Sequence, residues 1–98
     1  MSLHRIGEFS AREGQEQALR SFFATTVLPF IRASAGNLGC ELLQDCERPA
    51  RFIVVERWES AEAHAASLAS APPEAFAAVL PLLDGMPAGA WYLKQENR

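Results

Sequence analysis

The sequence predicts an α+β domain of the ferredoxin-like class, with an antiparallel sheet and the element order βαββααβ. Two observations lead to this fold class. Segments that alternate like strands and segments with helical periodicity follow one another in that order. The two middle strands are separated only by ERPA, residues 47–50, a connection short enough to favour an antiparallel hairpin. Because no linker or repeat interrupts the 98 residues, we expect one domain over residues 1–98.

The first strand and the first helix are predicted from alternation and from helical spacing. Residues 3–9, LHRIGEF, alternate as a strand does. Ser10 followed by Glu13 has the spacing of a capping box, and Gly14 could delay the helix. The helix should continue to about Ala33, with Pro29 bending its last turn. Its apolar positions, which recur at steps of three and four, are Leu19, Phe22, Phe23, Val27, Phe30 and Ile31.

The predicted hairpin consists of residues 38–46 and 51–58, and its second strand is the more informative. Phe52, Val54, Glu56 and Trp58 share one face, and Arg51, Ile53, Val55 and Arg57 share the other. The middle of this strand is apolar on both faces, whereas an antiparallel strand with one solvated face alternates more cleanly. Helices can cover one face, so a second copy of the chain is the natural cover for the other.

The C-terminal half is predicted to contain two helices and a last strand. Ser60 suits the N-cap of a helix over residues 61–70. Pro73 can begin the next helix, which should run to about Leu83. Residues 90–95, AWYLKQ, alternate like a final strand. The core stripe of the last helix is predicted to be Phe76, Val79, Leu80 and Leu83.

Composition excludes several classes of function. The net charge of −3 and the single lysine give no basic patch for nucleic acid. No apolar run approaches the roughly 20 residues that span a bilayer, and no secretion signal is present, so a cytoplasmic location is expected. Cys40 and Cys46 are interpreted as buried, reduced thiols. Without a His/Cys cluster or a glycine-rich phosphate loop, we expect no metal and no cofactor.

The element order, together with the segments G-N-L-G-C-E-L-L-Q and F-I-V-V-E-R-W-E-S-A-E-A-H, resembles the antibiotic biosynthesis monooxygenase (ABM) family of the dimeric α/β-barrel superfamily. The most specific part runs from Glu56 to Ala63, and the similarity extends from His4 to about Leu93. The resemblance implies a homodimer packed sheet against sheet, with a pocket between sheet and helices in each subunit. Members of this kind include cofactor-free oxygenases of polyketide phenols, quinol oxidases and haem degraders.

Some positions depart from the family pattern. Several members carry a helix histidine where this chain has Ser67, and His64 lies one turn earlier, where relatives have a bulky apolar residue. The three characteristic residues of the haem-degrading branch are replaced by Gly7, Ser67 and Ala77, which argues against haem breakdown. The missing histidine favours a second hypothesis, a noncatalytic dimeric module that binds a small ligand in the same pocket.

The first hypothesis is a cofactor-independent monooxygenase of a phenol- or quinol-type substrate. Such an enzyme deprotonates its substrate, and the electron-rich anion then reduces O₂ directly, so the protein needs an apolar pocket, a base and hydrogen-bond donors. His64 is the candidate base, although a lone histidine on a helix can equally be a packing residue. The candidate substrate-binding residues, each of which could instead serve packing or ion pairing, are Trp58, Glu56, Ser67 and Arg5. Trp91 or Tyr92 could anchor the subunit interface.

Overall fold

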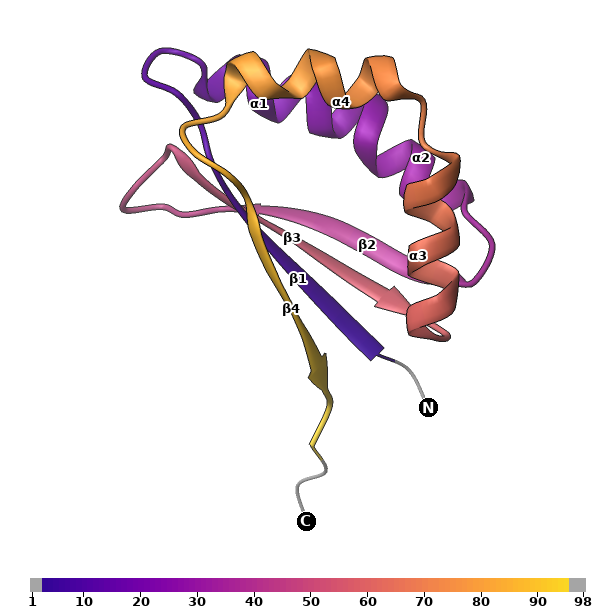
Figure 1. The fold of residues 1–98 in the computed structure, drawn as a ribbon. Helices are drawn as coiled ribbons and strands as arrows, with labels where there is room; N and C mark the ends of the chain where they lie inside the picture. Colours follow the sequence, from indigo (N-terminus) through magenta and orange to yellow (C-terminus); the bar gives the residue numbers. More distant parts are fainter. Residues whose placement is uncertain (1–2, 96–98) are drawn as a thin grey trace.

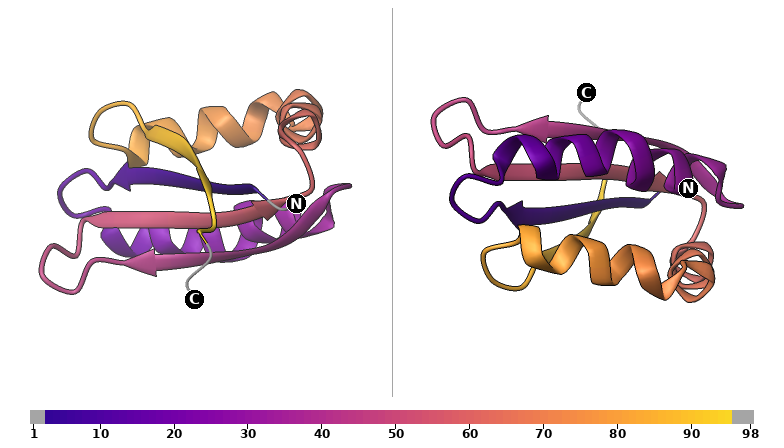
Figure 2. Two further views of the ribbon diagram at one scale, coloured as in Figure 1. Left: turned by 90° about the horizontal axis from the view of Figure 1, so that it is seen from below. Right: turned by 90° about the horizontal axis from the view of Figure 1, so that it is seen from above.

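A computed structural model of the chain describes residues 3–95 and contains one four-stranded antiparallel sheet. Its strands are β1 (Leu3–Ser10), β2 (Asn37–Gln44), β3 (Arg51–Trp58) and β4 (Ala88–Leu93), arranged in the order β2-β3-β1-β4. The helices gather on one face of this sheet and leave the other face open (Figures 1 and 2). The structure therefore confirms the predicted α+β, ferredoxin-like fold.

The first helical run consists of α1 (Glu16–Phe22), the π-helical turn η1 (Phe23–Val27) and α2 (Leu28–Ala33). Pro29 has no N–H to donate to the preceding turn, and the run widens there rather than ending: the N–H of Leu28 reaches the carbonyl of Phe23. The predicted capping box at Ser10 is wrong. Ser10 still belongs to β1, and α1 begins at Glu16 without a side-chain cap, because the turn at Gly14, with φ of +82°, comes first.

The second helical run consists of α3 (Ala61–Ser70), α4 (Pro73–Val79) and the 3₁₀ turn η2 (Leu80–Leu82). The predicted cap is confirmed, since the Ser60 hydroxyl accepts the N–H of Ala63 at 3.1 Å. The first run lies over β2 and β3, whereas α4 lies on the β1 side (Figure 2). No helix in the described part of the chain is long and apolar enough to cross a membrane.

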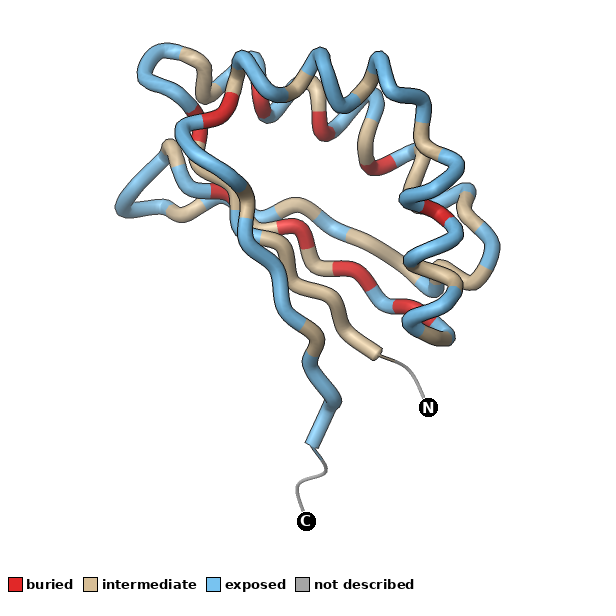
Figure 3. The backbone as a smooth tube through the Cα atoms, viewed as in Figure 1, coloured by how far each residue is buried: buried red, intermediate tan, exposed pale blue. Residues whose placement is uncertain are grey.

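The core lies between the first helical run and β3 (Figure 3). Phe23 is buried there, and its ring meets that of Phe9 edge to face at 4.9 Å. The predicted inner face of β3 is confirmed, because Phe52, Val54, Glu56 and Trp58 are all buried. The other buried apolar residues are Ala11, Leu19, Leu28 and Leu83.

The predicted core stripe of α4 is only partly buried. Leu83 is buried and Val79 is half-buried, but Phe76 is 57% exposed and Leu80 is 45% exposed. The sheet explains the difference, because β1 and β4 present glycines toward the helices. Gly7 and Gly89 have no side chain of their own, and the space beside them is taken by the Phe9 ring and the Arg5 guanidinium.

The open face of the sheet has an apolar middle and a polar end. Ile6, Ile53 and Val55 are half-buried on this face, while Leu43 and Tyr92 are about half exposed. Two surface hollows lie here, one lined partly by Leu43 and Ile53 and the other partly by Ile6 and Tyr92. The apolar side chains on this side have no helix above them.

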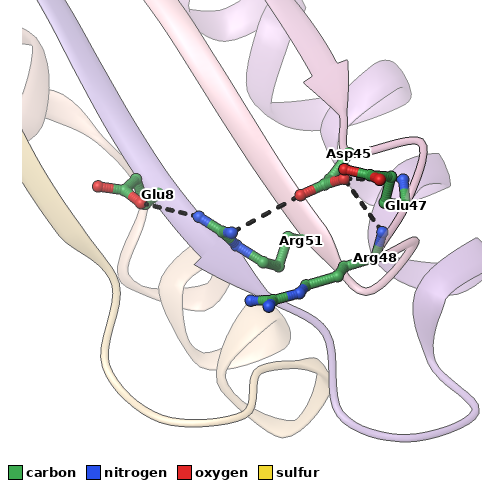
Figure 4. A network of polar contacts seen from close by, with 5 residues as sticks. All are labelled: Glu8, Asp45, Glu47, Arg48 and Arg51. Carbon is green, nitrogen blue, oxygen red and sulfur yellow. Dashed lines mark hydrogen bonds and ion pairs between the residues drawn. The ribbon is translucent and has the colours of Figure 1, made fainter.

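The polar end of the open face is an ion-pair network at the β2–β3 turn (Figure 4). Arg51 lies 3.4 Å from Glu8 and 3.6 Å from Asp45. Asp45 also accepts the backbone N–H groups of Glu47 and Arg48, and these hydrogen bonds hold the pKa of its carboxyl below the ordinary value. The network closes the hairpin by joining β1, β2 and β3.

The two cysteines are both unpaired, and only one of them is partly covered. Cys40 is half-buried on β2, and burial raises the pKa of its thiol. Cys46 is exposed, so its predicted burial is wrong. The reason is that β2 ends at Gln44, two residues before Cys46, rather than at residue 46.

Candidate functional site

The candidate site is built on one row of residues across the helix-facing side of the sheet. Cys40 pairs with Glu56, Glu56 with Arg5, and Arg5 with Trp91, following the order β2-β3-β1-β4. Cross-strand partners share a face, and Glu56 alternates with buried neighbours on β3, so all four residues face the helices. The sheet thus places a carboxyl group, a guanidinium and an indole side by side.

Glu56 and Trp58 form the buried part of the site. Trp58 has no exposed surface, and its Nε1–H donates to Glu56 Oε1 at 2.7 Å. Glu56 itself is only 9% exposed. Burial raises the pKa of Glu56, although the Trp58 hydrogen bond and the positive charge of Arg5 both oppose that shift. The indole N–H of Trp58, a candidate substrate-binding residue, is thus engaged by Glu56.

The imidazole of His64 lies between two indole rings. Its centroid is 5.5 Å from that of Trp58 and 5.1 Å from that of Trp91, with both pairs near perpendicular. Burial lowers the pKa of His64, and the charge of Arg5 lowers it further. No hydrogen bond joins the ring to another residue within 3–95, so its nitrogens are not engaged by the protein there.

Arg5 supplies the positive charge of the site. Its guanidinium carbon lies 5.2 Å from the centre of the Trp91 ring, within the range of a cation–π contact. The guanidinium also lies over Gly89, where a Cβ would come within 2.6 Å of one of its nitrogens. Only a glycine at this position of β4 therefore leaves room for Arg5 as it is placed.

Ser67 is engaged elsewhere. Its hydroxyl lies 2.9 Å from that of Ser34, at the end of α2. Because Ser34 donates its own proton to the carbonyl of Phe30, Ser67 is the donor in this pair. Ser67 is buried, and the hydrogen bond ties α3 to α2. The structure therefore assembles Arg5, Glu56, Trp58 and His64 into one group and leaves Ser67 out of it.

Trp91 is the member of this group that sequence reasoning did not place there. Alternation separates Gly89 and Trp91 from Ala90 and Tyr92, but it does not say which pair faces the helices. The pairing of Trp91 with Arg5 decides the matter, and it depends on β4 lying beside β1. No cluster of three potential metal ligands occurs among residues 3–95.

Comparisons with known proteins agree with this fold. The family model described as antibiotic biosynthesis monooxygenase matches residues 2–79. SnoaB, a cofactor-independent oxygenase from Streptomyces nogalater, superposes with a TM-score of 0.80 at 16% identity, covering 98% of this chain and 95% of its own. A protein from Bordetella bronchiseptica assigned to the antibiotic biosynthesis monooxygenases gives 0.84 at 20% identity, with 97% and 98% covered.

A Shewanella oneidensis protein is also similar, at 26% identity and a TM-score of 0.80 over 93% of this chain and 88% of that one. No curated protein matches the chain. The likeness to SnoaB and to the Bordetella protein concerns the fold alone, because both share less than a quarter of their residues with this chain.

Proposed function

The chain belongs to the antibiotic biosynthesis monooxygenase family, and we propose that it is a cofactor-independent monooxygenase of an aromatic phenol- or quinol-type molecule. The observation that carries the proposal is the half-buried His64 between two indoles, with its pKa lowered by burial and by the neighbouring cation of Arg5. A base, a positive charge and an aromatic surface are what the deprotonation and oxidation of a phenol require of a protein.

The proposed pocket lies between the sheet and α4. Phe76 and Leu80 are largely exposed although they share a helical face with the half-buried Val79 and the buried Leu83. On the helix-facing side of the sheet, β1 and β4 carry Gly7 and Gly89, with the Phe9 ring and the Arg5 guanidinium beside them. Exposed apolar side chains of this kind suit an aromatic ring, which would cover them on binding.

The proposed reaction begins when neutral His64 accepts the proton of the substrate hydroxyl. The resulting anion is electron-rich and donates electrons to O₂ directly. In the net reaction of an anthrone-like substrate, a CH₂ group becomes a carbonyl: one atom of O₂ enters the product and the other leaves as water with the two hydrogens. Trp58 acts indirectly, because it holds Glu56 and packs against His64.

Oxygen uptake with a panel of hydroquinones and anthrones tests this function. We expect His64→Ala to lower kcat/KM by about a hundredfold, the usual contribution of a general base. Because the pKa of His64 is lowered from 6.5, the wild-type kcat/KM should decrease on acidification only below pH 6.5, where protonation of His64 removes the base. Glu62→Ala, an exposed change on the same helix, is the control and should keep full activity.

A noncatalytic ligand-binding module is the second candidate. It is favoured by Ser67, which occupies the place of the family's helix histidine and offers only a hydroxyl already bonded to Ser34. Binding of panel members without oxygen uptake would support this role. If oxygen uptake is unchanged in His64→Ala, His64 is not the general base, and the proposed mechanism is contradicted.

We also propose that the open face of the sheet binds a second copy of the chain. The apolar side chains of Ile6, Ile53 and Val55 are uncovered by any helix, and a subunit of this size gains stability by burying them. Light scattering should give about twice the 10.7 kDa of one chain. Val55→Asp should shift the mass toward that of a monomer, whereas Gln17→Asp, on an exposed helix surface, should not; a monomeric wild type contradicts the proposal.

A further inference from the structure

Arg5 is a half-buried cation for which residues 3–95 supply no counter-ion. The ion pairs of the described residues all involve Arg51, and the Arg5 side chain donates no hydrogen bond there. No buried side-chain nitrogen lacks a partner among the described residues, so the unbonded nitrogens of Arg5 are reached by solvent. The five N–H donors of the guanidinium are therefore available to an anion.

Glu56 does not serve as that counter-ion, although it is the cross-strand neighbour of Arg5. Its Oε1 accepts the indole N–H of Trp58, and burial raises the pKa of its carboxyl. The charge of Arg5 opposes that rise but does not overcome it. No ion-pair contact joins the two side chains in the described residues.

The guanidinium is nevertheless held in place. Trp91 lies against it at 5.2 Å, and Gly89 leaves the space that it occupies on β4. His64 adds no second positive charge, because burial and Arg5 both lower its pKa. The row across the sheet thus carries one buried carboxyl bonded to Trp58 and one guanidinium held against Trp91.

We infer that Arg5 binds an anionic oxygen carried by an aromatic ligand, so that the site selects aromatic anions over neutral rings of the same shape. The inference rests on the proposed pocket and narrows its substrate class. The ring lies against the aromatic surface at Trp91, and the oxyanion, a phenolate or a carboxylate, lies on the planar fork of Arg5. In the proposed oxygenase this contact holds the substrate in its reactive, deprotonated form.

The test is calorimetric binding of 4-nitrophenol, 4-nitrobenzoate and nitrobenzene, at a pH above the pKa of 4-nitrophenol. The wild type should bind at least one of the two anions about tenfold more tightly than nitrobenzene. Arg5→Gln should abolish that preference without weakening nitrobenzene, and Arg5→Lys should keep part of it. Arg20→Gln, which removes an exposed arginine on α1, should leave the preference unchanged.

A second variant tests the same inference if Arg5→Gln fails to fold. Gly89→Ala leaves the charge in the chain but places a Cβ where the guanidinium lies, so the anion preference should fall. If 4-nitrophenolate binds more tightly than 4-nitrobenzoate, the ligand's anionic group is a phenolate. The reverse order indicates a carboxylate. Equal binding of all three compounds to the wild type overturns the inference and leaves the pocket intact. If none of the three compounds binds, both the inference and the proposed pocket are overturned. Oxygen uptake then tests the proposed monooxygenase activity separately.

Discussion

Trp58→Ala is expected to lower the free energy of unfolding by about 3–5 kcal/mol, the usual cost of truncating a buried aromatic residue. Trp58 is the largest side chain that the fold encloses completely, and its removal leaves Glu56 without the donor of its buried hydrogen bond. Because a domain of this size is stable by only about 5–15 kcal/mol, the variant should be close to unfolding. Urea denaturation followed by circular dichroism measures the loss.

Two further variants separate packing from hydrogen bonding at Trp58. Trp58→Phe keeps most of the apolar surface but has no N–H. We therefore expect the free energy of unfolding to fall by about 1–3 kcal/mol, because Glu56 loses its hydrogen-bond donor. Trp91→Ala, at a half-buried position on the edge strand β4, should cost clearly less than Trp58→Ala. If Trp58→Ala cost no more than Trp91→Ala, the placement of Trp58 in the enclosed interior would be contradicted.

Gly36→Ala is expected to lower the free energy of unfolding by about 3 kcal/mol, from a disfavoured backbone conformation and a steric clash together. Gly36 has φ of +85°, and a Cβ there would lie 2.6 Å from the Cβ of Ala63 on α3. The carbonyl of Gly36 also accepts the N–H of Glu59 at 2.9 Å, so this turn supports the start of α3. Thermal and urea unfolding both measure the change.

Gly85→Ala provides a matched control for Gly36. Gly85 has nearly the same backbone angle, φ of +83°, but nothing lies within 4 Å of its Cβ position, so only the conformational cost of about 1 kcal/mol should remain. Ala63→Gly should recover part of the loss when combined with Gly36→Ala, because it removes the atom that clashes. Equal losses in the two glycine variants would contradict the close approach of the turn to α3.

Much of the fold could be predicted because local signals agree with one another at several points. The strand Arg51–Trp58 and the helix Ala61–Ser70 have the predicted bounds, since a short hairpin connection and the Ser60 cap mark them in the sequence. Other boundaries depend on tertiary pairing. The last strand covers Ala88–Leu93 rather than residues 90–95, because its extent follows the partners available on β1.

The candidate site could be predicted in part for the same reason. Alternation along one strand suffices to place Glu56 beside Trp58. The meeting of His64 with Trp91, by contrast, depends on how α3 lies over the far edge of the sheet. The bond between Ser67 and Ser34 depends on the packing of two helices, which no local pattern reveals. The exposure of Phe76 depends on how α4 packs in the fold, which a helical stripe alone does not show.

The central position of β1 has a consequence for the kinetics of folding. Leu3 lies in register with Trp58 of β3 on one side and with Leu93 of β4 on the other. Both partners are remote in sequence, so long loops must close before this strand gains a single sheet hydrogen bond. We therefore expect a high relative contact order and a slow, cooperative collapse, in which the sheet forms late and comes apart as a unit.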